Sequence, residues 1–151
     1  MALKEQITAE MKAALLGGDR FVGETLRNLR AAILNEEVAT NRRDTGLTDE
    51  EIEKVVAREV KKRVESAKLY RDNNRLDLAE PEEQEIAVLK KFLPEQIDEG
   101  ELTRLVADKI AILGESGPQA MGQIIGALKQ DLGNKADGAL LARIVKEQLN
   151  N

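Results

Sequence analysis

The longest amphipathic run in the chain follows directly on a helix-capping signal. Thr48 and Glu51 have the spacing of a capping box, in which the hydroxyl accepts from an exposed amide and the glutamate reaches back to the cap. Apolar residues then recur at helical spacing, at Ile52, Val55, Val56, Val60, Val64 and Ala67. We therefore expect a helix from this cap to about Asp72, where the sequence Asn-Asn-Arg ends it.

Six further runs have the same helical periodicity, and none has the alternation of a convincing strand. Helices are expected near 3–16, 19–41, 80–92 and 98–113, with two shorter helices opening at 118 and 137. The predicted buried face of the second helix consists of Val22, Leu26, Leu29, Ile33 and Val38. Pro81 suits the first turn of a helix, which favours a start near Glu80, although a preceding turn from Leu76 stays open.

The composition fits a helical core built from aliphatic side chains. The chain has 151 residues, of which 2% are aromatic and 34% are charged. Leu, Ile, Val and Ala must therefore fill the core, and abundant Glu, Lys and Arg favour helices over sheets. We predict an all-α protein with an N-terminal four-helix domain, residues 1–94, and a small C-terminal three-helix domain, residues 95–151.

Missing residue types exclude several kinds of chemistry. The chain has neither Cys nor His, which removes thiolate metal sites, a Cys nucleophile and the commonest general base. It also lacks a phosphate-binding P-loop and a nucleophile-elbow serine. Acids crowd one helix start, at Glu80, Glu82, Glu83 and Glu85, where the helix dipole stabilises them. We predict no catalytic residue, no metal and no cofactor.

Charge and hydropathy limit the partners. The net charge is −5 and the pI is about 5.0, which argues against a strongly nonspecific nucleic-acid binder. No apolar run approaches the roughly 18 residues of a membrane span. The first residues also lack the apolar core of a signal peptide, so a cytoplasmic protein without membrane contact is expected.

Two glycines and one loop in the C-terminal part have alternative interpretations. Gly122 and Gly126 lie four apart on one helix face, which suggests close approach of another backbone, with intramolecular packing favoured over an RNA phosphate. In the following loop, Gly133 fits a helix stop and Asp137 a helix start. That interpretation leaves Lys135 unexplained, and a lysine beside exposed helix amides could also form a phosphate site.

Basic residues also have two interpretations. The helices expected at 19–41 and 48–72 carry many Arg and Lys residues, which most simply form solvated faces with i,i+3 and i,i+4 ion pairs. A basic stripe for RNA phosphates is the alternative. After position 128, the four cations Lys129, Lys135, Arg143 and Lys146 outnumber the acids Asp131, Asp137 and Glu147. This end is the only locally positive part of the C-terminal domain.

Two long stretches carry a family resemblance. The segment KKFLPEQIDEGELTRLV, followed by MGQIIGALKQDLGNKADGALLARIVKEQL, resembles the YqeY family of GatB/YqeY-domain proteins, and earlier segments fit the same family over nearly the whole chain. The matching motif positions are Met121, Gly122, Gly126, Lys135, Ala136, Asp137 and Gly138. Three positions depart from the family pattern: Asp131 and Asn134, where a lysine-rich run is expected, and Pro81, where the helix is usually continuous.

The resemblance implies a helical N-terminal domain and a C-terminal domain similar to the tail of the B subunit of tRNA-dependent amidotransferases. In those enzymes the tail helps to hold tRNA, while the chemistry lies in a kinase-like domain and an amidase subunit that this chain lacks. We therefore expect a non-enzymatic accessory protein that binds tRNA phosphates through Lys129, Lys135, Arg143 and Lys146. The alternative is a helical adaptor for a synthetase or amidotransferase subunit. A stand-alone amidotransferase or ligase is disfavoured by the missing catalytic groups.

Overall fold

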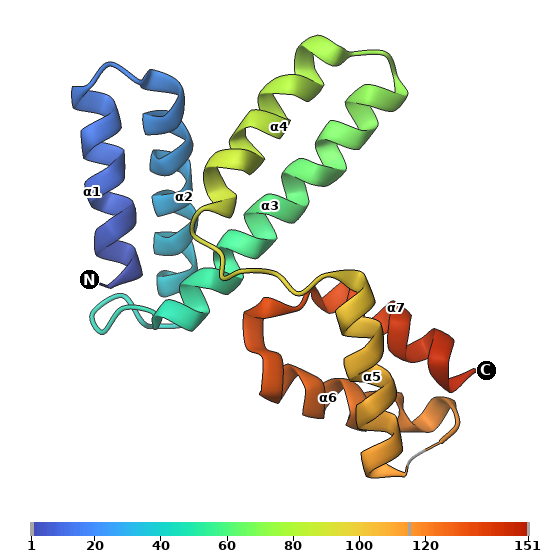
Figure 1. Ribbon diagram of the computed structural model, residues 1–151. Helices are drawn as coiled ribbons and strands as arrows, with labels where there is room; N and C mark the ends of the chain where they lie inside the picture. The colour runs from blue at the N-terminus through green and yellow to red at the C-terminus, as the bar shows by residue number, and fades with distance from the viewer. Residues whose placement is uncertain (1, 115, 151) are drawn as a thin grey trace. The chain divides into compact units, whose positions relative to one another are not determined.

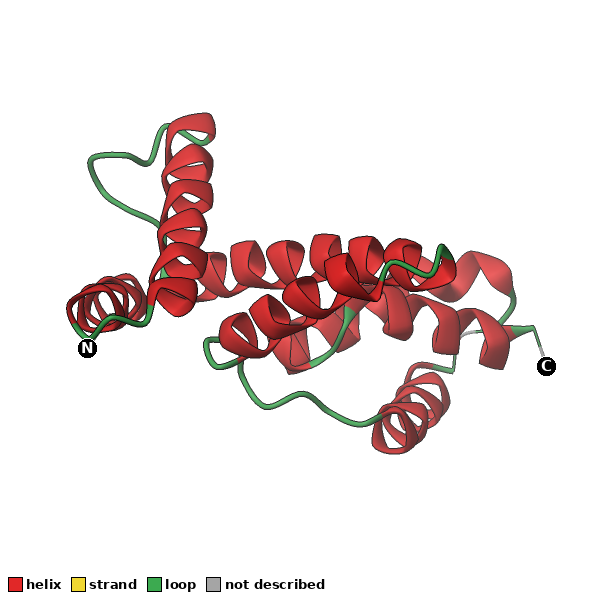
Figure 2. Ribbon diagram, turned by 90° about the horizontal axis from the view of Figure 1, so that it is seen from above, coloured by secondary structure: helices red, strands yellow, loops and turns green. Residues whose placement is uncertain are grey.

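The computed structural model describes residues 2–114 and 116–150, and over these residues the predicted all-α class is confirmed (Figures 1 and 2). The described residues form seven α-helices and no strand. The α-helices are α1 (Leu3–Leu16), α2 (Arg20–Ala39), α3 (Asp49–Asp72), α4 (Leu76–Lys90), α5 (Glu99–Leu113), α6 (Met121–Leu132) and α7 (Gly138–Leu149). Short 3-10 turns, η1 (Pro118–Ala120) and η2 (Gly133–Lys135), flank α6.

The chain divides into two compact units, an N-terminal unit over Met1–Leu93 and a C-terminal unit over Pro94–Asn151. Each unit has an apolar core of its own. The division falls beside Pro94, whose ring biases the residue before it away from helical angles and so ends the preceding helical stretch. Each unit is described separately below.

The N-terminal unit consists of two helical hairpins, α1 with α2 and α3 with α4 (Figure 1). Its core is entirely aliphatic apart from Met11 and Phe92; the buried members are Ile7, Met11, Leu26, Leu29, Ile33, Ile52, Val55, Val56, Val60, Leu89 and Phe92. The first hairpin packs closely because Gly23 faces α1. A Cβ at this position would lie 2.4 Å from Leu15 Cδ2, so the Leu15 side chain would have to move.

The helix start predicted from Thr48 is confirmed, and Asp98 caps α5 in the same way. Thr48 Oγ1 accepts from Glu51 N at 3.2 Å, and Asp98 Oδ1 accepts from Glu101 N at 2.8 Å. In a capping box the glutamate side chain would also bind the backbone amide of the cap residue. Here the Glu51 carboxylate instead accepts from Arg42 Nη1, at 3.2 and 3.3 Å. A short side chain that accepts from an amide three residues later is a local feature, and local features can be read from sequence.

The expected start of α4 near Glu80 is wrong. The helix begins at Leu76, so Pro81 lies in its second turn rather than its first. Packing against α3 explains the earlier start, because Ala79 is fully buried and Arg71 on α3 forms an ion pair with Glu83. These contacts favour helix from Leu76 despite the amide hydrogen that proline lacks.

Two residues of the apolar runs that predicted α2 and α3 are exposed. Val38 on α2 has 55% of its surface exposed, and Val64 on α3 has 48%. On α2 the position one turn beyond Ile33 is Glu37, which is 1% exposed and takes the place of an apolar residue at the end of the buried stripe. A charged residue at a core position is rare, so hydropathy alone would not predict it.

The C-terminal unit is a three-helix arrangement in which α5, α6 and α7 contact one another (Figure 1). Its buried core consists of Leu102, Val106, Ala120, Ile124, Leu128, Leu141, Ile144 and Val145. At the end of α5, Gly114 has a φ of 67° and closes the helix in the left-handed conformation that glycine adopts readily. Ion pairs across the surface join Lys109 to Asp131 and Arg143 to Glu99.

Candidate nucleic-acid interface

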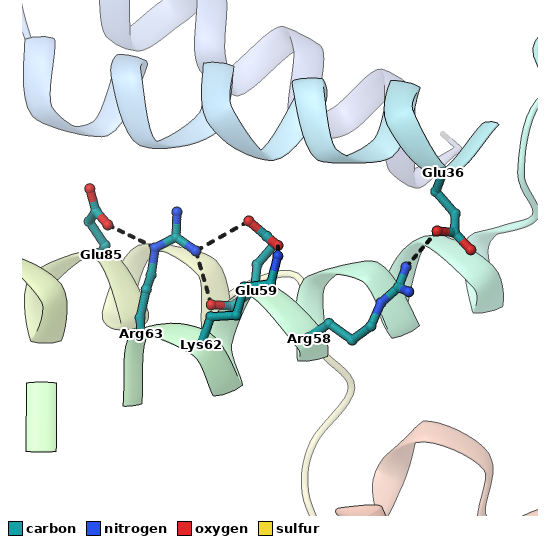
Figure 3. A network of polar contacts seen from close by, with 6 residues as sticks. All are labelled: Glu36, Arg58, Glu59, Lys62, Arg63 and Glu85. Atoms are coloured by element: carbon teal, nitrogen blue, oxygen red, sulfur yellow. Dashed lines mark hydrogen bonds and ion pairs between the residues drawn. The ribbon is translucent and has the colours of Figure 1, made fainter. Parts of the chain in front are cut away.

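Half of the basic residues on α2 and α3 form ion pairs with glutamates: Arg27, Arg58, Lys62, Arg63 and Arg71. Arg58 Nη2 lies 2.9 Å from Glu36 Oε2, and Lys62 Nζ lies 3.1 Å from Glu59 Oε2 (Figure 3). Within the same network, Arg63 lies between Glu59 and Glu85. These pairs support the interpretation of the two helices as solvated, charge-compensated faces.

Arg63 is the most enclosed cation of this network. Its Nε donates to Glu85 Oε2 at 2.7 Å, and its Nη1 donates to the Glu59 carbonyl oxygen at 2.9 Å. Only 13% of its side chain is exposed. A guanidinium held by two carboxylates and a carbonyl ties α3 to α4 and is not available to a phosphate.

The Glu82 carboxylate on α4 makes the stability of the α3–α4 hairpin depend on pH. Burial raises the pKa of Glu82, and the Glu85 carboxylate raises it further, while Arg63 partly offsets both effects. When the pKa of a group is higher in the folded state than in the unfolded state, its contribution to stability is fully present below the unfolded-state pKa. That contribution is lost as pH rises through the folded-state pKa. Glu82→Gln is therefore expected to increase the free energy of unfolding at about pH 7, with a smaller gain at about pH 4, in urea titrations.

Glu83 provides a matched control of opposite sign. Its hydrogen bond with Arg71 lowers the pKa of Glu83, so this carboxylate stabilises the fold above its unfolded pKa and loses that effect as pH falls. Glu83→Gln should therefore be destabilising at neutral pH and approach neutrality in acid. Equal behaviour of the two variants would contradict the assignment of the Glu82 shift to burial.

The C-terminal unit contains three cations that differ from the paired residues of α3. Lys129 in the last turn of α6, Lys135 in η2 and Lys146 on α7 are all exposed, and no ion pair joins any of them within residues 2–114 and 116–150. Arg143, the fourth predicted RNA-binding residue, lies one turn before Lys146 on α7 but binds Glu99 Oε1 at 2.6 Å. The structure thus separates the predicted set into three exposed lysines and one paired arginine.

The loop that carries Lys135 is held by the motif that opens the unit. Gln96 Nε2 donates to the Asn134 carbonyl oxygen at 2.8 Å, and Ile97 N donates to the Lys135 carbonyl oxygen at 2.9 Å. The Leu-Pro-Glu-Gln and Asn-Lys-Ala-Asp-Gly elements are therefore one structural feature. Sequence reasoning missed Gln96 and Ile97, since nothing in their local pattern indicates a partner nearly forty residues away.

The start of α7 is already capped by the chain itself. Asp137 Oδ1 accepts from Ala139 N at 3.2 Å, and the Asp137 carbonyl oxygen accepts from Leu141 N at 2.9 Å. The predicted role of Asp137 as the helix start is thereby confirmed. Because a carboxylate occupies this helix end, an added phosphate would meet its negative charge, and any contribution of Lys135 must come from its exposed side chain.

The favoured prediction for Gly122 and Gly126, close packing against another part of the chain, is wrong. Both are exposed, and a Cβ built on either one, or on Gly138, meets no atom within 4 Å. Met121 and Ala136, the other motif positions, are half-buried and pack against the core. The unit therefore presents bare glycine backbone on the exposed side of α6, while its close helix packing uses apolar side chains.

This exposed backbone has a direct consequence for stability. Gly126→Ala is expected to raise the free energy of unfolding by about 0.5–1 kcal/mol, because alanine restricts the unfolded chain and nothing opposes its Cβ. Chemical denaturation followed by helical circular dichroism would measure the gain. Gly133→Ala is the contrasting variant, since a φ of 56° at Gly133 strains any L side chain, and it should lower stability.

Other kinds of site find no support in the described part of the chain. No group of three or more His, Cys, Asp or Glu residues among the described positions could hold a metal ion. No described helix combines the length and apolarity needed to cross a membrane. Exposed lysines beside bare glycine backbone are thus the main candidate for binding in the C-terminal unit.

Comparison with known proteins places these features in a family. Residues 4–149 match the family described as Yqey-like protein. Two relatives share the name "Altered inheritance of mitochondria protein 41, mitochondrial". That of Clavispora lusitaniae is 30% identical over 135 residues, 87% of this chain and 76% of its own length. That of Lachancea thermotolerans is 28% identical over 111 residues, 72% of this chain and 58% of its own length. The family match extends across both units, and the chain therefore belongs to the Yqey-like protein family.

Proposed function

We propose that this protein is a non-enzymatic, tRNA-associated accessory protein whose C-terminal unit contacts RNA phosphates. The observation that carries the proposal is the set of exposed lysines Lys129, Lys135 and Lys146, which have no ion pair among the described residues. Exposed ammonium groups can release counterions from RNA, whereas cations already paired with carboxylates contribute less. The exposed glycine backbone at Gly122 and Gly126 would let a phosphate or ribose approach α6 closely.

The link to tRNA-dependent amidotransferases comes from the resemblance of the C-terminal unit to their tail domain. In this proposal the protein shares tRNA binding with those enzymes and none of their chemistry. Its likeness to these carbon–nitrogen ligases is confined to the shared tail domain. The protein would act where tRNA is found. A cytoplasmic location is part of this proposal, while the names of the fungal relatives say that those proteins are mitochondrial.

A salt-dependent binding experiment tests the proposal. Anisotropy of labelled bulk tRNA should show weak binding by the full chain near 50 mM salt that is largely lost near 200 mM. The triple variant Lys129→Ala, Lys135→Ala and Lys146→Ala should bind about tenfold or more weakly. Its plot of log affinity against log salt should be shallower by about 2–3 units, roughly one for each phosphate contact removed.

A second triple variant controls for net charge. Lys54, Lys61 and Lys68 on α3 are exposed and carry no ion pair within the described chain, so their replacement by alanine changes the charge equally. Normal tRNA binding by this variant would support the C-terminal interface. An equal loss in both triple variants, or no binding by the wild-type protein at micromolar concentration, would contradict it.

Exposed apolar residues favour an adaptor as the second candidate function. Leu34 and Val38 lie one turn apart on α2 and are 44% and 55% exposed. Such a pair can anchor a partner helix, and a synthetase or amidotransferase subunit is the expected partner. Retrieval of that subunit from nuclease-treated extract, and its loss with Leu34→Ser and Val38→Ser, would favour the adaptor over direct RNA binding.

A further inference from the structure

A groove in the N-terminal unit lies where α1 meets α2. It has a volume of about 230 Å³, and its polar lining comes from Lys4 on α1 and from Arg27, Arg30 and Glu37 on α2. Leu34, which is 44% exposed, contributes apolar surface to the same groove. It therefore combines three cations and one carboxylate with a short aliphatic wall.

Arg30 has an unmet need for a hydrogen-bond acceptor. Its Nε atom is buried, and among the described residues it is the only buried side-chain nitrogen or oxygen without a hydrogen-bond partner. A buried donor that lacks an acceptor destabilises the fold, and more so when it belongs to a charged group. Because Nε itself has almost no accessible surface, an oxyanion in the groove would bind the terminal Nη atoms of the same guanidinium.

The other charges of the groove leave Arg30 as its main uncompensated cation. Lys4 Nζ lies 2.9 Å from Glu37 Oε1, so these two groups neutralise each other. Arg27 lies 3.3 Å from Glu24, but both side chains are largely exposed, and such pairs are weak. The groove consequently keeps a positive balance toward an approaching anion.

We propose that the α1–α2 groove binds an oxyanion, a phosphate or carboxylate group, through the Arg30 guanidinium. The planar fork of guanidinium matches the oxygens of either group and can bind them with two parallel hydrogen bonds. Arg27 adds a second cation, and Leu34 accommodates a short apolar portion of the ligand. The volume is below the roughly 300–1,000 Å³ of most ligand pockets, so the ligand is a small anion.

This site is separate from the proposed tRNA contacts. It lies in the N-terminal unit and uses none of the lysines of α6, η2 and α7. Failure of tRNA binding would leave it intact, and its own failure would leave the tRNA proposal intact.

Arginine side-chain resonances provide a direct test in the full chain. Nε–Hε signals of ¹⁵N-labelled protein can be followed during separate titrations with sodium phosphate and sodium acetate, with sodium chloride at matched ionic strength as the reference. The Arg30 signal should shift saturably with at least one oxyanion and remain nearly constant with chloride. A response to phosphate alone assigns a phosphate ligand, a response to acetate alone assigns a carboxylate, and either supports the site.

Two charge-matched variants sharpen the test. Arg30→Gln should weaken the binding measured from backbone amide shifts of α2 by about tenfold to a hundredfold. Arg20→Gln removes the same charge at the exposed start of α2, outside the groove, and should bind normally. Arg30→Lys retains the charge without the fork and should be weakened as well, which keeps the test valid if Arg30→Gln folds poorly.

The proposal is overturned by either of two results. One is an Arg30 shift that stays linear in oxyanion concentration and equals the shifts of exposed arginines such as Arg20 and Arg43. The other is saturable binding by folded Arg30→Gln with the affinity of the wild-type protein.

Discussion

Replacing Ile124 with alanine is expected to lower the free energy of unfolding of the C-terminal unit by about 3 kcal/mol. Ile124 is fully buried on α6 in the core shared with α5 and α7. Its truncation removes apolar contacts and leaves a cavity that a small unit cannot easily collapse. A unit of fewer than 60 residues has little stability to spare, so its amide signals should lose dispersion at moderate urea while those of the N-terminal unit persist.

Ile112 offers the same chemical change on the surface of the same unit. It lies on α5 and is 76% exposed, so Ile112→Ala should change stability by no more than about 0.5 kcal/mol. Resolved amide signals are the suitable readout, because the chain has no Trp and its single Tyr lies in the other unit. Similar costs for both isoleucine variants would contradict the core assignment.

Replacing Lys4 with alanine is expected to cost about 3 kcal/mol in the N-terminal unit, a large effect for a residue on a helix surface. Lys4 Nζ donates to both Glu37 oxygens, at 2.9 and 3.1 Å, and the Glu37 side chain is only 1% exposed. Without the ammonium group, a buried carboxylate remains without its cation, and this remaining charge accounts for the cost. Urea unfolding at neutral pH would measure it.

A double-mutant cycle separates this pair from ordinary loss of contacts. Replacing both Lys4 and Glu37 with methionine should restore most of the stability that either methionine substitution removes alone. The reason is that no uncompensated charge is left in the double variant. Lys12→Ala on the same helix is the matched control, since Lys12 is exposed and no ion pair involves it in the described chain. If Lys12→Ala costs as much as Lys4→Ala, the pair with Glu37 is not the cause.

Helix starts and stops were accessible from sequence because they depend on neighbouring residues. Thr48, Asp98 and Asp137 each accept from an amide two or three residues later, and Gly114 closes α5 within the same turn. None of these interactions requires knowledge of the partner helix. Their residue types and spacing therefore predict the boundaries.

Where partners lie far apart in the chain, the local pattern was misleading. The start of α4 at Leu76 reflects packing on α3, and hydropathy could not reveal Glu37 as a core residue because its partner, Lys4, lies on α1. No close helix approach is found at Gly122 or Gly126. A close approach is found at Gly23 in the other unit, opposite Leu15. Glycine spacing on one helix does not show which side meets another element.

The candidate site divides in the same way. The four cations of the C-terminal unit follow from sequence, but the pairing of Arg143 with Glu99 depends on the contact between α7 and α5. The tRNA role of the lysines remains a prediction. The hydrogen bonds from Gln96 and Ile97 to the loop were not predictable, because their acceptors are backbone carbonyls that the sequence cannot position.

The hydrogen bond from Ile97 N to Lys135 O makes one amide a reporter for the whole C-terminal unit. Ile97 precedes α5, so its protection from hydrogen exchange owes nothing to any helix ladder. The hydrogen bond joins the segment before α5 to η2, which follows α6, and α5 packs on α6 in the same unit. Slow exchange at Ile97 would therefore measure cooperative opening of the unit, while fraying of any single helix end would leave this amide protected.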